Sequence, residues 1–386
     1  MNPIRVVYCT TILTICSLYA AQPIQPVFQQ EFALSDFQAI LFTTFMLAPL
    51  GIAPMVYGFF LEIFPIKKIL RISILLMGIL EILFVSSSNY YTLLIIRCAQ
   101  GLVIPAILTS LMSYVSYISP KEKVQQAIAL YVGATTLGGF GGRLLSGLLT
   151  DFLGWRFFFL VLGIGFFGIY FLLNKLSDDV QPRYVKPSPS VICSLLKKPQ
   201  FYWLYICIFT VFFVFSAIMN FLPFRLVEIS PSSGASGIGM LYLGYAMGIT
   251  VSIVNKRIRE FFHKEWRAIA VGLILFFIGT LFFISTSYIM LFVGMFIFCT
   301  GMFGAHTLLS GYLNILGNNN KAVANGLYIS FYYAGGTFGS FMPSFVLNEY
   351  SWNIFIVILC FFICFAFFCN LQLKAAVESV RIKRDS

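Results

Sequence analysis

Charge is scarce in this sequence. Charged residues make up 10% of the 386 residues, and only 2 residues are histidine. A soluble domain is about 25% charged, so the composition excludes a soluble globular protein. Hydrophobic residues account for 59% of the chain, and the mean hydropathy is +0.90. These values are typical of a protein that folds in a lipid bilayer.

The motifs of several function classes are also missing. No stretch of about 10 residues alternates in polarity, which excludes a transmembrane β-barrel. The 9 cysteines have no metal-ligand spacing, and none falls in a predicted outer loop, so we expect free thiols. The chain has no Gly-x-x-x-x-Gly-Lys loop, no Ser-His-Asp arrangement and no metal cluster. We therefore expect no enzyme, no cofactor, no metal and no direct use of ATP.

Long hydrophobic runs fill most of the chain. A spanning helix needs roughly 20 mostly apolar residues, and we expect an all-α membrane protein with 12 such helices. The predicted spans are 5–27, 38–60, 69–88, 91–115, 124–149, 157–174, 201–223, 237–254, 268–286, 289–314, 323–347 and 353–373.

The first six runs reappear as the last six at a spacing of 197 residues. Pro26 matches Pro223 and Lys67 matches Lys264, although the fourth and tenth spans slip to a spacing of 200 residues. Two halves in the same order are parallel repeats, which is typical of transporters with a site between the halves. The predicted parts are a first half at 1–174, a linker at 175–200, a second half at 201–373 and a tail at 374–386. The clearest matches pair Leu130, Tyr131, Gly138, Gly139, Gly142 and Trp155 with Leu327, Tyr328, Gly335, Gly336, Gly339 and Trp352.

The net charge of +11 is concentrated on one side of the predicted membrane. If the chain starts in the cytoplasm, 21 of its 25 Lys and Arg fall in cytoplasmic tails and loops, and only Arg156 and Arg225 lie in outer loops. This positive-inside bias predicts cytoplasmic termini and a cytoplasmic linker, and it argues against a nucleic-acid-binding face. The 21 residues are Arg5, Lys67, Lys68, Arg71, Lys121, Lys123, Lys175, Arg183, Lys186, Lys197, Lys198, Lys256, Arg257, Arg259, Lys264, Arg267, Lys321, Lys374, Arg381, Lys383 and Arg384.

A specific motif stands near the start of the fourth span. Arg97-Cys98-Ala99-Gln100-Gly101 resembles the Arg-x-x-Gln-Gly element of proton-linked exporters in the major facilitator superfamily. The resemblance covers nearly all of residues 5–373. It implies that helices 1, 4, 7 and 10 line a cavity while helices 3, 6, 9 and 12 lie outermost. It also implies a proton gradient as the energy source. The supporting features are the loop from Gly58 through Glu62 to Lys67, the glycine-rich fifth span, and Tyr19-x-x-Gln22-Pro23-x-x-Pro26 in the first.

Two segments depart from that family's pattern. Its loop usually carries Asp, Gly and Arg where this chain has Glu62, Pro65 and Ile66, so we expect the inward gate to lock differently. The exporter branch often has Gly-Pro in the fifth helix, where this chain has Gly142-Arg143. The resemblance favours export, although the antiporter signature of the fifth helix is incomplete in this chain.

Small residues form a stripe in the fifth span. They recur every four positions, which places them on one helix face and permits close backbone approach. The stripe either serves helix packing alone or forms a pivot on which the two halves rock. Both interpretations predict contact across the halves. The stripe contains Ala134, Gly138, Gly142 and Ser146, with Gly335 and Gly339 in the eleventh span and a looser set of Gly239, Gly244 and Gly248 in the eighth.

Ionisable residues within spans are costly, at about 2.5–3.5 kcal/mol each by insertion scales, so each needs a partner or water. Glu81 and Arg97 lie eight residues either side of Asn89, the expected tip of a helical hairpin, which puts both at the same depth. They either pair, as a switch rather than a source of stability, or bond elsewhere. Arg143 either contacts an anionic substrate or anchors its helix.

His306 titrates near neutral pH when unperturbed, so it either carries a coupled proton or packs. Gln22 and Gln25 flank Pro23, and Asn220 precedes Pro223. Proline leaves helix carbonyls without their usual N–H donor. These amides therefore either donate hydrogen bonds to the freed carbonyls or contact the substrate. The candidate substrate-path or coupling residues are Gln22, Gln25, Glu81, Arg97, Gln100, Arg143, Asn220 and His306, and the candidate gating or packing residues are Gly58, Glu62, Lys67, Gly138, Gly142, Gly335 and Gly339.

These observations favour a secondary transporter of the inner membrane, functional as a monomer, that exports a small drug-like compound or metabolite against protons. Its expected partners are a small-molecule substrate and the bilayer, without nucleic acid. The alternatives are an importer or symporter of a small anionic nutrient, and a receptor or scaffold that kept the fold without translocation.

Overall fold

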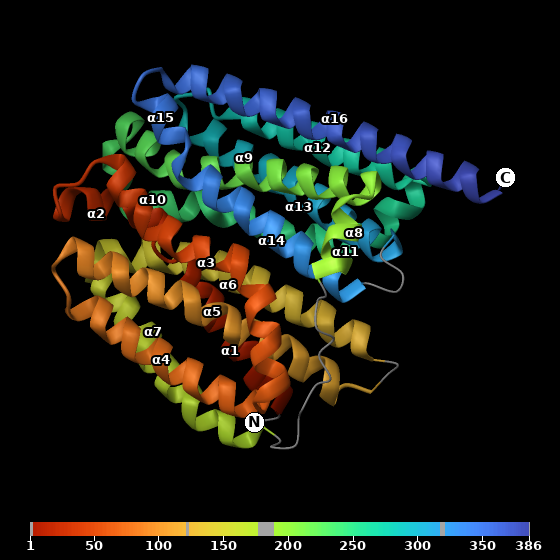
Figure 1. Cartoon of the computed structure of the whole chain (residues 1–386). Coiled ribbons are helices and arrows are strands. Elements are labelled where there is room, and N and C mark those ends of the chain that lie inside the picture. The colour runs from red at the N-terminus through yellow and green to blue at the C-terminus, as the bar shows by residue number, and fades with distance from the viewer. Residues whose placement is uncertain (1–2, 121–122, 177–188, 317–320, 386) are drawn as a thin grey trace. The chain divides into compact units, whose positions relative to one another are not determined.

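The computed structural model describes residues 3–120, 123–176, 189–316 and 321–385, and every regular element in them is helical (Figure 1). The elements are α1 (Pro3–Tyr19), η1 (Gln22–Ile24), α2 (Gln25–Glu31), α3 (Asp36–Ile63), α4 (Ile66–Ser86), α5 (Tyr90–Ile118), α6 (Val124–Leu153), α7 (Trp155–Leu172), η2 (Leu173–Lys175), α8 (Pro189–Leu196), α9 (Pro199–Ile229), η3 (Pro231–Ser233), α10 (Gly234–Leu241), η4 (Tyr242–Ala246), α11 (Met247–Phe262), α12 (Glu265–Phe282), α13 (Tyr288–Leu316), α14 (Lys321–Phe341), α15 (Pro343–Leu347) and α16 (Trp352–Asp385).

Each of the twelve predicted spans falls on one helix or on a run of consecutive helices. Within the described ranges, 9 helical segments are long and apolar enough to cross a membrane, and the apolar stretch Asp36–Ile52 is shorter. The glycine-rich α6 and α14 are not among the 9. The predicted all-α membrane fold is confirmed.

Proline acts differently in different spans. The first span is divided into α1, η1 and α2 around Pro23 and Pro26, because proline cannot donate a backbone hydrogen bond inside a helix. Pro105 and Pro223, by contrast, remain inside the continuous helices α5 and α9.

Two segments are more helical than expected. The short helix α8 lies within the predicted linker at 175–200, and α16 continues to Asp385 through most of the predicted tail. Residues 177–188 of the linker lie outside the described residues.

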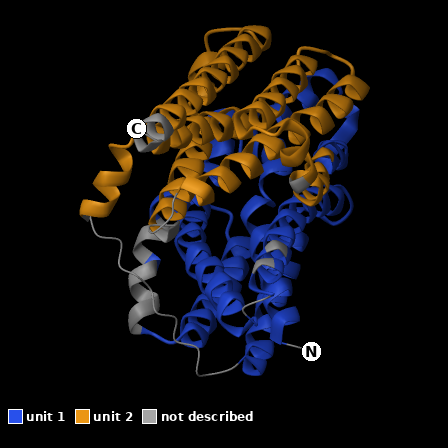
Figure 2. Cartoon of the chain, turned by 90° about the vertical axis from the view of Figure 1, so that its right-hand side faces the viewer, with its two compact units in different colours: residues 1–186, 220–243 blue, residues 187–219, 244–386 orange. Residues whose placement is uncertain are grey.

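The chain divides into two compact units, coloured separately in Figure 2. Unit 1 contains residues 1–186 and 220–243, and unit 2 contains residues 187–219 and 244–386. In unit 1, α1 packs against α5, α6 and α7, α3 packs against α5, and α4 packs against α7. The helix α10 also belongs to unit 1, where it packs against α6. The division into repeat halves remains a prediction.

Unit 2 is built around α13. This helix packs against α11, α12 and α14, and α16 covers the other side of α12 (Figure 1). Apolar side chains fill the interior, with Phe276 and Phe298 stacked at 4.6 Å between ring centres.

Equivalent contacts in the two units follow the sequence repeat. The Tyr8 hydroxyl donates to the carbonyl of Ala127 at 3.4 Å, and the Tyr205 hydroxyl donates to the carbonyl of Ala324 at 3.1 Å. Tyr205 is 197 residues after Tyr8, and Ala324 is 197 residues after Ala127. The repeat found in the sequence is therefore also a repeat of tertiary contacts.

Burial separates inner from outer helices. The spans of α1, α5, α9 and α13 bury 56–89% of their most apolar windows. The spans of α4, α7, α12 and α16 bury only 39–44%. This ranking agrees with the expectation that helices 1, 4, 7 and 10 are inner and that 3, 6, 9 and 12 are outermost.

Candidate functional site

Arg97 lies at the centre of a buried polar network in unit 1. Its Nε donates to the carbonyl of Phe42 in α3 at 3.1 Å, and its Nη1 donates to Oε1 of Gln100 at 2.9 Å. Both terminal nitrogens also reach the carbonyl of Ser17 in α1 at 3.5 Å. Because all three acceptors are neutral, dipoles rather than an opposite charge solvate this buried cation.

Two aromatic rings complete the surroundings of the guanidinium. The ring centres of Phe84 and Phe159 lie 5.4 and 5.7 Å from the central carbon of Arg97. Cation–π attraction at such distances is worth about 2 kcal/mol when the groups are desolvated. The rings therefore replace part of the hydration that Arg97 loses on burial.

Glu81, in α4, belongs to the same network. Its side chain is fully buried, and the Ser17 hydroxyl donates to its Oε1. Its Oε2 and the Nε2 of Gln100 are buried atoms without a hydrogen-bond partner in the described residues. An unsatisfied buried polar atom costs about 1–3 kcal/mol, so these two atoms mark a place for a proton or a polar ligand.

Of the two alternatives left open for Glu81 and Arg97, a direct pair or bonds to other groups, the structure contains the second. In the part of the chain that the structure describes, no ion pair joins them, and Ser17 contacts both side chains instead. The hairpin symmetry did indicate that the two lie close together. Asn89 is the N-cap of α5, where its side chain accepts from the N–H of Thr92 at 3.1 Å. Ser17 itself had no distinguishing signal in the sequence.

Arg143, in α6, forms a second buried cluster in unit 1. Its Nε donates to Oε1 of Gln22 at 2.7 Å, and its Nη1 donates to the carbonyl of Gly139 at 2.9 Å. The ring of Tyr19 lies 4.0 Å from the guanidinium, and that of Tyr242 lies 5.6 Å away. These contacts anchor α6 to the break in the first span, and they also leave a desolvated positive charge beside polar groups.

Gln25 joins three helices of unit 1. Its Nε2 donates to Oγ1 of Thr43 in α3 and to Oδ1 of Asn220 in α9, both at 2.9 Å. All three side chains are fully buried, and Oε1 of Gln25 has no partner among the described residues. The amides of Gln22 and Gln25 therefore form hydrogen bonds with side chains of other helices. These bonds do not satisfy the backbone carbonyls that proline frees in their own span.

His306, in α13, lies in unit 2 with Tyr328 of α14. The Tyr328 hydroxyl lies 2.9 Å from Nδ1 of His306 and donates to the His306 carbonyl at 3.0 Å. A hydroxyl has one proton, so when that proton is given to the carbonyl, Nδ1 must donate to the tyrosine oxygen. This arrangement fixes the imidazole orientation, which is what a packing histidine requires.

Aromatic rings surround this histidine. The Tyr332 ring lies 4.9 Å from that of His306 and stacks on Phe212 of α9 at 3.6 Å. Phe212 also lies 5.8 Å from Phe215 in the same helix. Sequence reasoning had noted Tyr328 as a match in the internal repeat but had not singled out Phe212, because one of 44 phenylalanines carries no signal of its own.

Among the predicted small-residue stripes, the glycines of α6 and α14 contact the first helix of their own half, whereas Gly239 in the eighth span contacts α6, as expected for a contact across the halves. A Cβ on Gly138 or Gly142 would lie 2.7 or 2.6 Å from the carbonyl of Ile12 or Cys16 in α1. A Cβ on Gly335 or Gly339 would lie 2.2 or 2.1 Å from the carbonyl of Phe209 or Phe213 in α9. The stripes therefore pack each glycine-rich helix on the first helix of its own half, not on the other half.

A neighbouring face of α6 makes the contact with the eighth span. A Cβ on Gly147 would lie 2.5 Å from the carbonyl of Ala235 and 2.8 Å from Cα of Gly239 in α10. The Asp151 side chain accepts hydrogen bonds from the N–H groups of Ala235 at 2.9 Å and Ser236 at 2.8 Å. A carboxylate at a helix N-terminus is stabilising, so this contact of α6 with α10 is specific.

The predicted loop from Gly58 to Lys67 is mostly helical. Gly58 and Glu62 lie in α3, which ends at Ile63, and their side chains are outside the described residues. Lys67 lies in the first turn of α4, where its Nζ donates to the carbonyl of Leu176 at 2.7 Å. Lys67 therefore ties the start of α4 to the end of η2.

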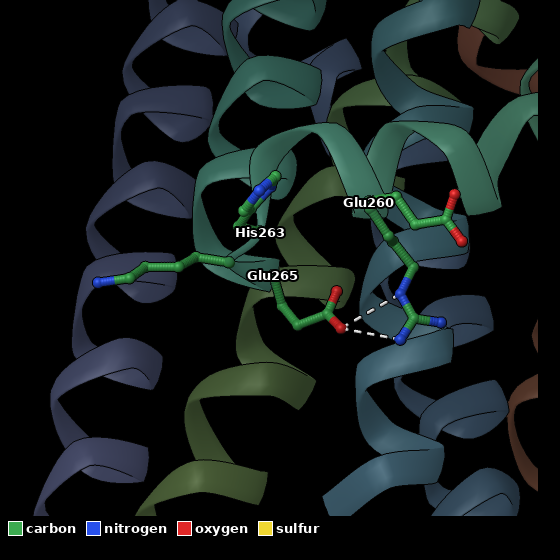
Figure 3. Close-up of a pocket in the computed structure, with 5 residues that line it drawn as sticks. Glu260, His263 and Glu265 are labelled. Carbon is green, nitrogen blue, oxygen red and sulfur yellow. Dashed lines mark hydrogen bonds and ion pairs between the residues drawn. The ribbon is translucent and has the colours of Figure 1, made fainter.

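A charged pocket of about 260 Å³ lies at the matching connection in unit 2, between α11 and α12 (Figure 3). Arg259 and Glu265 form an ion pair at 2.9 Å across it, and His263 adopts the left-handed conformation, with φ of 58°, that ends α11. The pocket is lined by Arg259, Glu260, His263, Lys264 and Glu265. The ion pair of Arg259 with Glu265 neutralises part of the charge of this pocket.

A multi-span helical protein with an internal repeat and buried polar networks on its inner helices is a membrane transporter in architecture. The sequence matches the family described as the Major Facilitator Superfamily over residues 7–340, and the chain belongs to that family. It is a multi-pass membrane transporter and not an enzyme.

Curated relatives agree with this assignment. An "Uncharacterized transporter" of Buchnera aphidicola is 27% identical over 92% of this chain and 87% of the relative. The "Inner membrane transport protein YnfM" of Escherichia coli is 24% identical over 88% of this chain and 82% of the relative. A "Probable sugar efflux transporter" of Haemophilus influenzae is 25% identical over 74% of this chain and 73% of the relative.

A solved structure of the nucleoside transporter NupG has the same fold. It aligns with a TM-score of 0.79 over 97% of this chain and 100% of that chain, at 10% sequence identity. At this identity the similarity concerns the fold alone.

Proposed function

We propose that this protein is a proton-coupled exporter of a small drug-like compound or metabolite, working by alternating access in the inner membrane with both termini cytoplasmic. The observation that carries the proposal is the Arg97-x-x-Gln100-Gly101 element, whose arginine and glutamine are fully buried in one network with Glu81. Arg97, Gln100 and Glu81 are buried polar side chains with two unsatisfied atoms among them, and burying them has a cost that packing alone does not explain. The similarity to a probable sugar efflux transporter also supports export.

The substrate path in this proposal follows the broken first span. We propose that Gln22 with Arg143 and Gln25 with Asn220 supply polar groups to this path in unit 1. In unit 2, taken by itself, His306 and Tyr332 form an aromatic surface. Rigid aromatic rings favour planar or apolar solutes, which agrees with a drug-like compound. We propose that the protein acts as a monomer.

Import of a small anionic nutrient is the second candidate. It is favoured by Arg97 in α5 and Arg143 in α6, two buried cations of unit 1.

Transport by reconstituted vesicles separates export from import. A panel would contain ethidium, chloramphenicol, lactose, uridine and succinate, each offered outside vesicles with an acidic or an alkaline lumen. An exporter that exchanges solute for protons accumulates solute only with an acidic lumen, because protons leave as solute enters. A symporter accumulates solute only with an alkaline lumen. No accumulation of any panel compound in either arrangement contradicts proton-coupled transport.

The expected accumulation of solute follows from the size of the pH gradient. One proton exchanged for one neutral solute gives about a tenfold accumulation for each pH unit of difference, because a pH unit and a tenfold concentration ratio each correspond to about 1.4 kcal/mol.

A further inference from the structure

Glu81 is the one acidic side chain that is buried in the described parts of the chain. It lies in the last third of α4, where the Ser17 hydroxyl binds one carboxyl oxygen and the other oxygen has no partner in the described residues. A carboxylate normally accepts several hydrogen bonds. A protonated carboxyl group carries no charge and needs fewer hydrogen-bond donors around it. The site is therefore built for a group that spends part of its cycle protonated.

Arg97 does not depend on Glu81 for its own hydrogen bonds. The carbonyls of Phe42 and Ser17 and the side chain of Gln100 accept from its guanidinium. Protonating Glu81 would therefore remove an electrostatic attraction but would leave every hydrogen bond of Arg97 in place. A direct ion pair would instead have left the arginine unpaired, at a cost of about 3–5 kcal/mol.

Ser17 connects Glu81 to the rest of the site. Its hydroxyl binds Glu81, while its backbone carbonyl accepts from Arg97. Ser17 lies in α1, five positions before Gln22 at the break of the first span. A change in the charge of Glu81 therefore acts directly on α1, the helix that precedes the break at Gln22 and Gln25.

We propose that Glu81 binds the coupled proton of this transporter and that Ser17 links its protonation to Arg97 and to the first span. This inference rests on the proposed proton coupling. It assigns the proton to the first half of the chain and not to His306.

The other ionisable groups on the helices packed around Glu81 are directed elsewhere. On α1, Cys16 binds the carbonyl of Gly138 and Tyr19 lies on Arg143, both in α6. On α7, Arg156 binds Glu31 and the carbonyl of Val85. On α5, Arg97 is the charged group that faces Glu81, with Cys98 next to it in sequence. The remaining basic groups lie at the start of α1, at the opposite end of α4 and in η2, namely Arg5, Lys67, Lys68, Arg71 and Lys175.

The test compares substitutions that keep the shape of the site. Glu81→Gln removes the titratable proton, Ser17→Ala removes the hydroxyl, and Ser17→Thr keeps it. Glu228→Gln is the matched control, because Glu228 is exposed and pairs with Arg225 at 2.9 Å. Each protein is reconstituted and assayed with the panel compounds that the wild type accumulates, in two modes. One mode is accumulation driven by a pH gradient, and the other is exchange of labelled for unlabelled compound at equal pH.

We expect E81Q to exchange the compound at a rate within about threefold of the wild type but to lose the roughly tenfold accumulation per pH unit. Ser17→Ala should lose most of the accumulation, Ser17→Thr should recover it, and E228Q should match the wild type. Accumulation by E81Q equal to that of the wild type would overturn the inference. A wild type that accumulates no compound would instead contradict the proposed function.

Infrared spectroscopy tests the proton directly and needs no transported compound. The wild type and E228Q should gain the carbonyl band of a protonated, buried carboxyl group between high and low pH, and E81Q should lack that band. If E81Q does not fold, Glu81→Asp serves in its place, and the band should then shift in position. A band that persists in E81Q, or that is unchanged in Glu81→Asp, overturns the assignment.

Discussion

Replacing Gly142 by alanine should push α1 and α6 apart. The added Cβ would lie 2.6 Å from the carbonyl oxygen and 2.7 Å from the Cα of Cys16. Both neighbours are backbone atoms, so no side-chain rotation can relieve the contact. The two helices can accommodate the methyl group only by separating, which would also disturb the bond from the Cys16 thiol to the Gly138 carbonyl at 3.3 Å.

The expected cost follows from two opposing terms. Overpacking a well-packed interface costs about 1–3 kcal/mol, and alanine in place of glycine inside a helix returns roughly 0.5–1 kcal/mol. We therefore expect a net loss of about 1–2 kcal/mol of unfolding free energy for Gly142→Ala. Gly133→Ala in the same helix is the control, because a Cβ there would meet no atom within 4 Å. It should be neutral or stabilising by up to about 1 kcal/mol.

The assay is unfolding of the purified protein in mixed micelles as denaturing detergent is added, followed by circular dichroism. Equal unfolding free energies for Gly142→Ala and Gly133→Ala would refute the reasoning from backbone contact. Transport per folded molecule then separates packing from a pivot. If the stripe only packs, the rate of Gly142→Ala should stay within about twofold of the wild type. If α6 pivots on α1, the rate should fall by more than the loss of folded protein explains.

Three further predictions concern orientation and the buried polar groups. A reporter enzyme that is active only outside the cytoplasm should be silent when inserted after Lys175, and strong activity there would contradict cytoplasmic termini. Arg97→Lys should keep exchange but lower uphill transport about tenfold or more, because lysine lacks the planar fork that reaches Phe42, Gln100 and Ser17 together. Unchanged uphill transport in both Arg97→Lys and Arg97→Ala would remove this residue from the mechanism. His306→Gln should retain most of the rate, and neither it nor His306→Ala should alter the profile between about pH 5.5 and about pH 8.5, because Tyr328 engages both the ring and the carbonyl. Loss of the same pH-dependent component in both variants would make His306 the proton carrier.

The helices and their repeat could be predicted because they depend on local properties. The length of the apolar runs predicted the twelve spans. The 197-residue spacing of the sequence repeat reappears in the contacts Tyr8–Ala127 and Tyr205–Ala324. The closeness of Glu81 and Arg97 followed from hairpin geometry alone. These inferences needed only rise per residue, chain order and bilayer thickness.

The partners of these elements could not be predicted, because they depend on how each helix is rotated about its axis. Small residues at Gly138 and Gly142 indicated close approach, but the sequence does not say that α1 is the neighbour. For the same reason Ser17, one polar residue in an apolar helix, gave no sign that it contacts both Glu81 and Arg97. The proline break was predictable, whereas the contacts of Gln22 and Gln25 with Arg143 and Asn220 were not.

The charges of the buried networks connect the direction of transport to the charge of the substrate. Glu81, Arg97 and Arg143 are the buried ionic side chains in the described residues. Two arginines and one carboxylate give +1, and protonation of Glu81 raises this sum to +2. A cationic substrate would then bind better when the proton has left, which is competition and produces exchange. An anionic substrate would bind better with the proton present, which is cooperation and produces symport.

The size of this coupling is large enough to decide between export and import. A unit charge at about 8 Å in a medium of effective dielectric constant about 20 contributes about 2 kcal/mol, or about a 30-fold change in affinity. Ethidium should therefore bind about 30-fold more weakly at low pH than at high pH, and succinate should show the opposite dependence if it binds at all. E81Q should abolish both dependences. If ethidium affinity is independent of pH in the wild type while transport remains proton-coupled, the proton and the substrate interact through helix movement and not through charge.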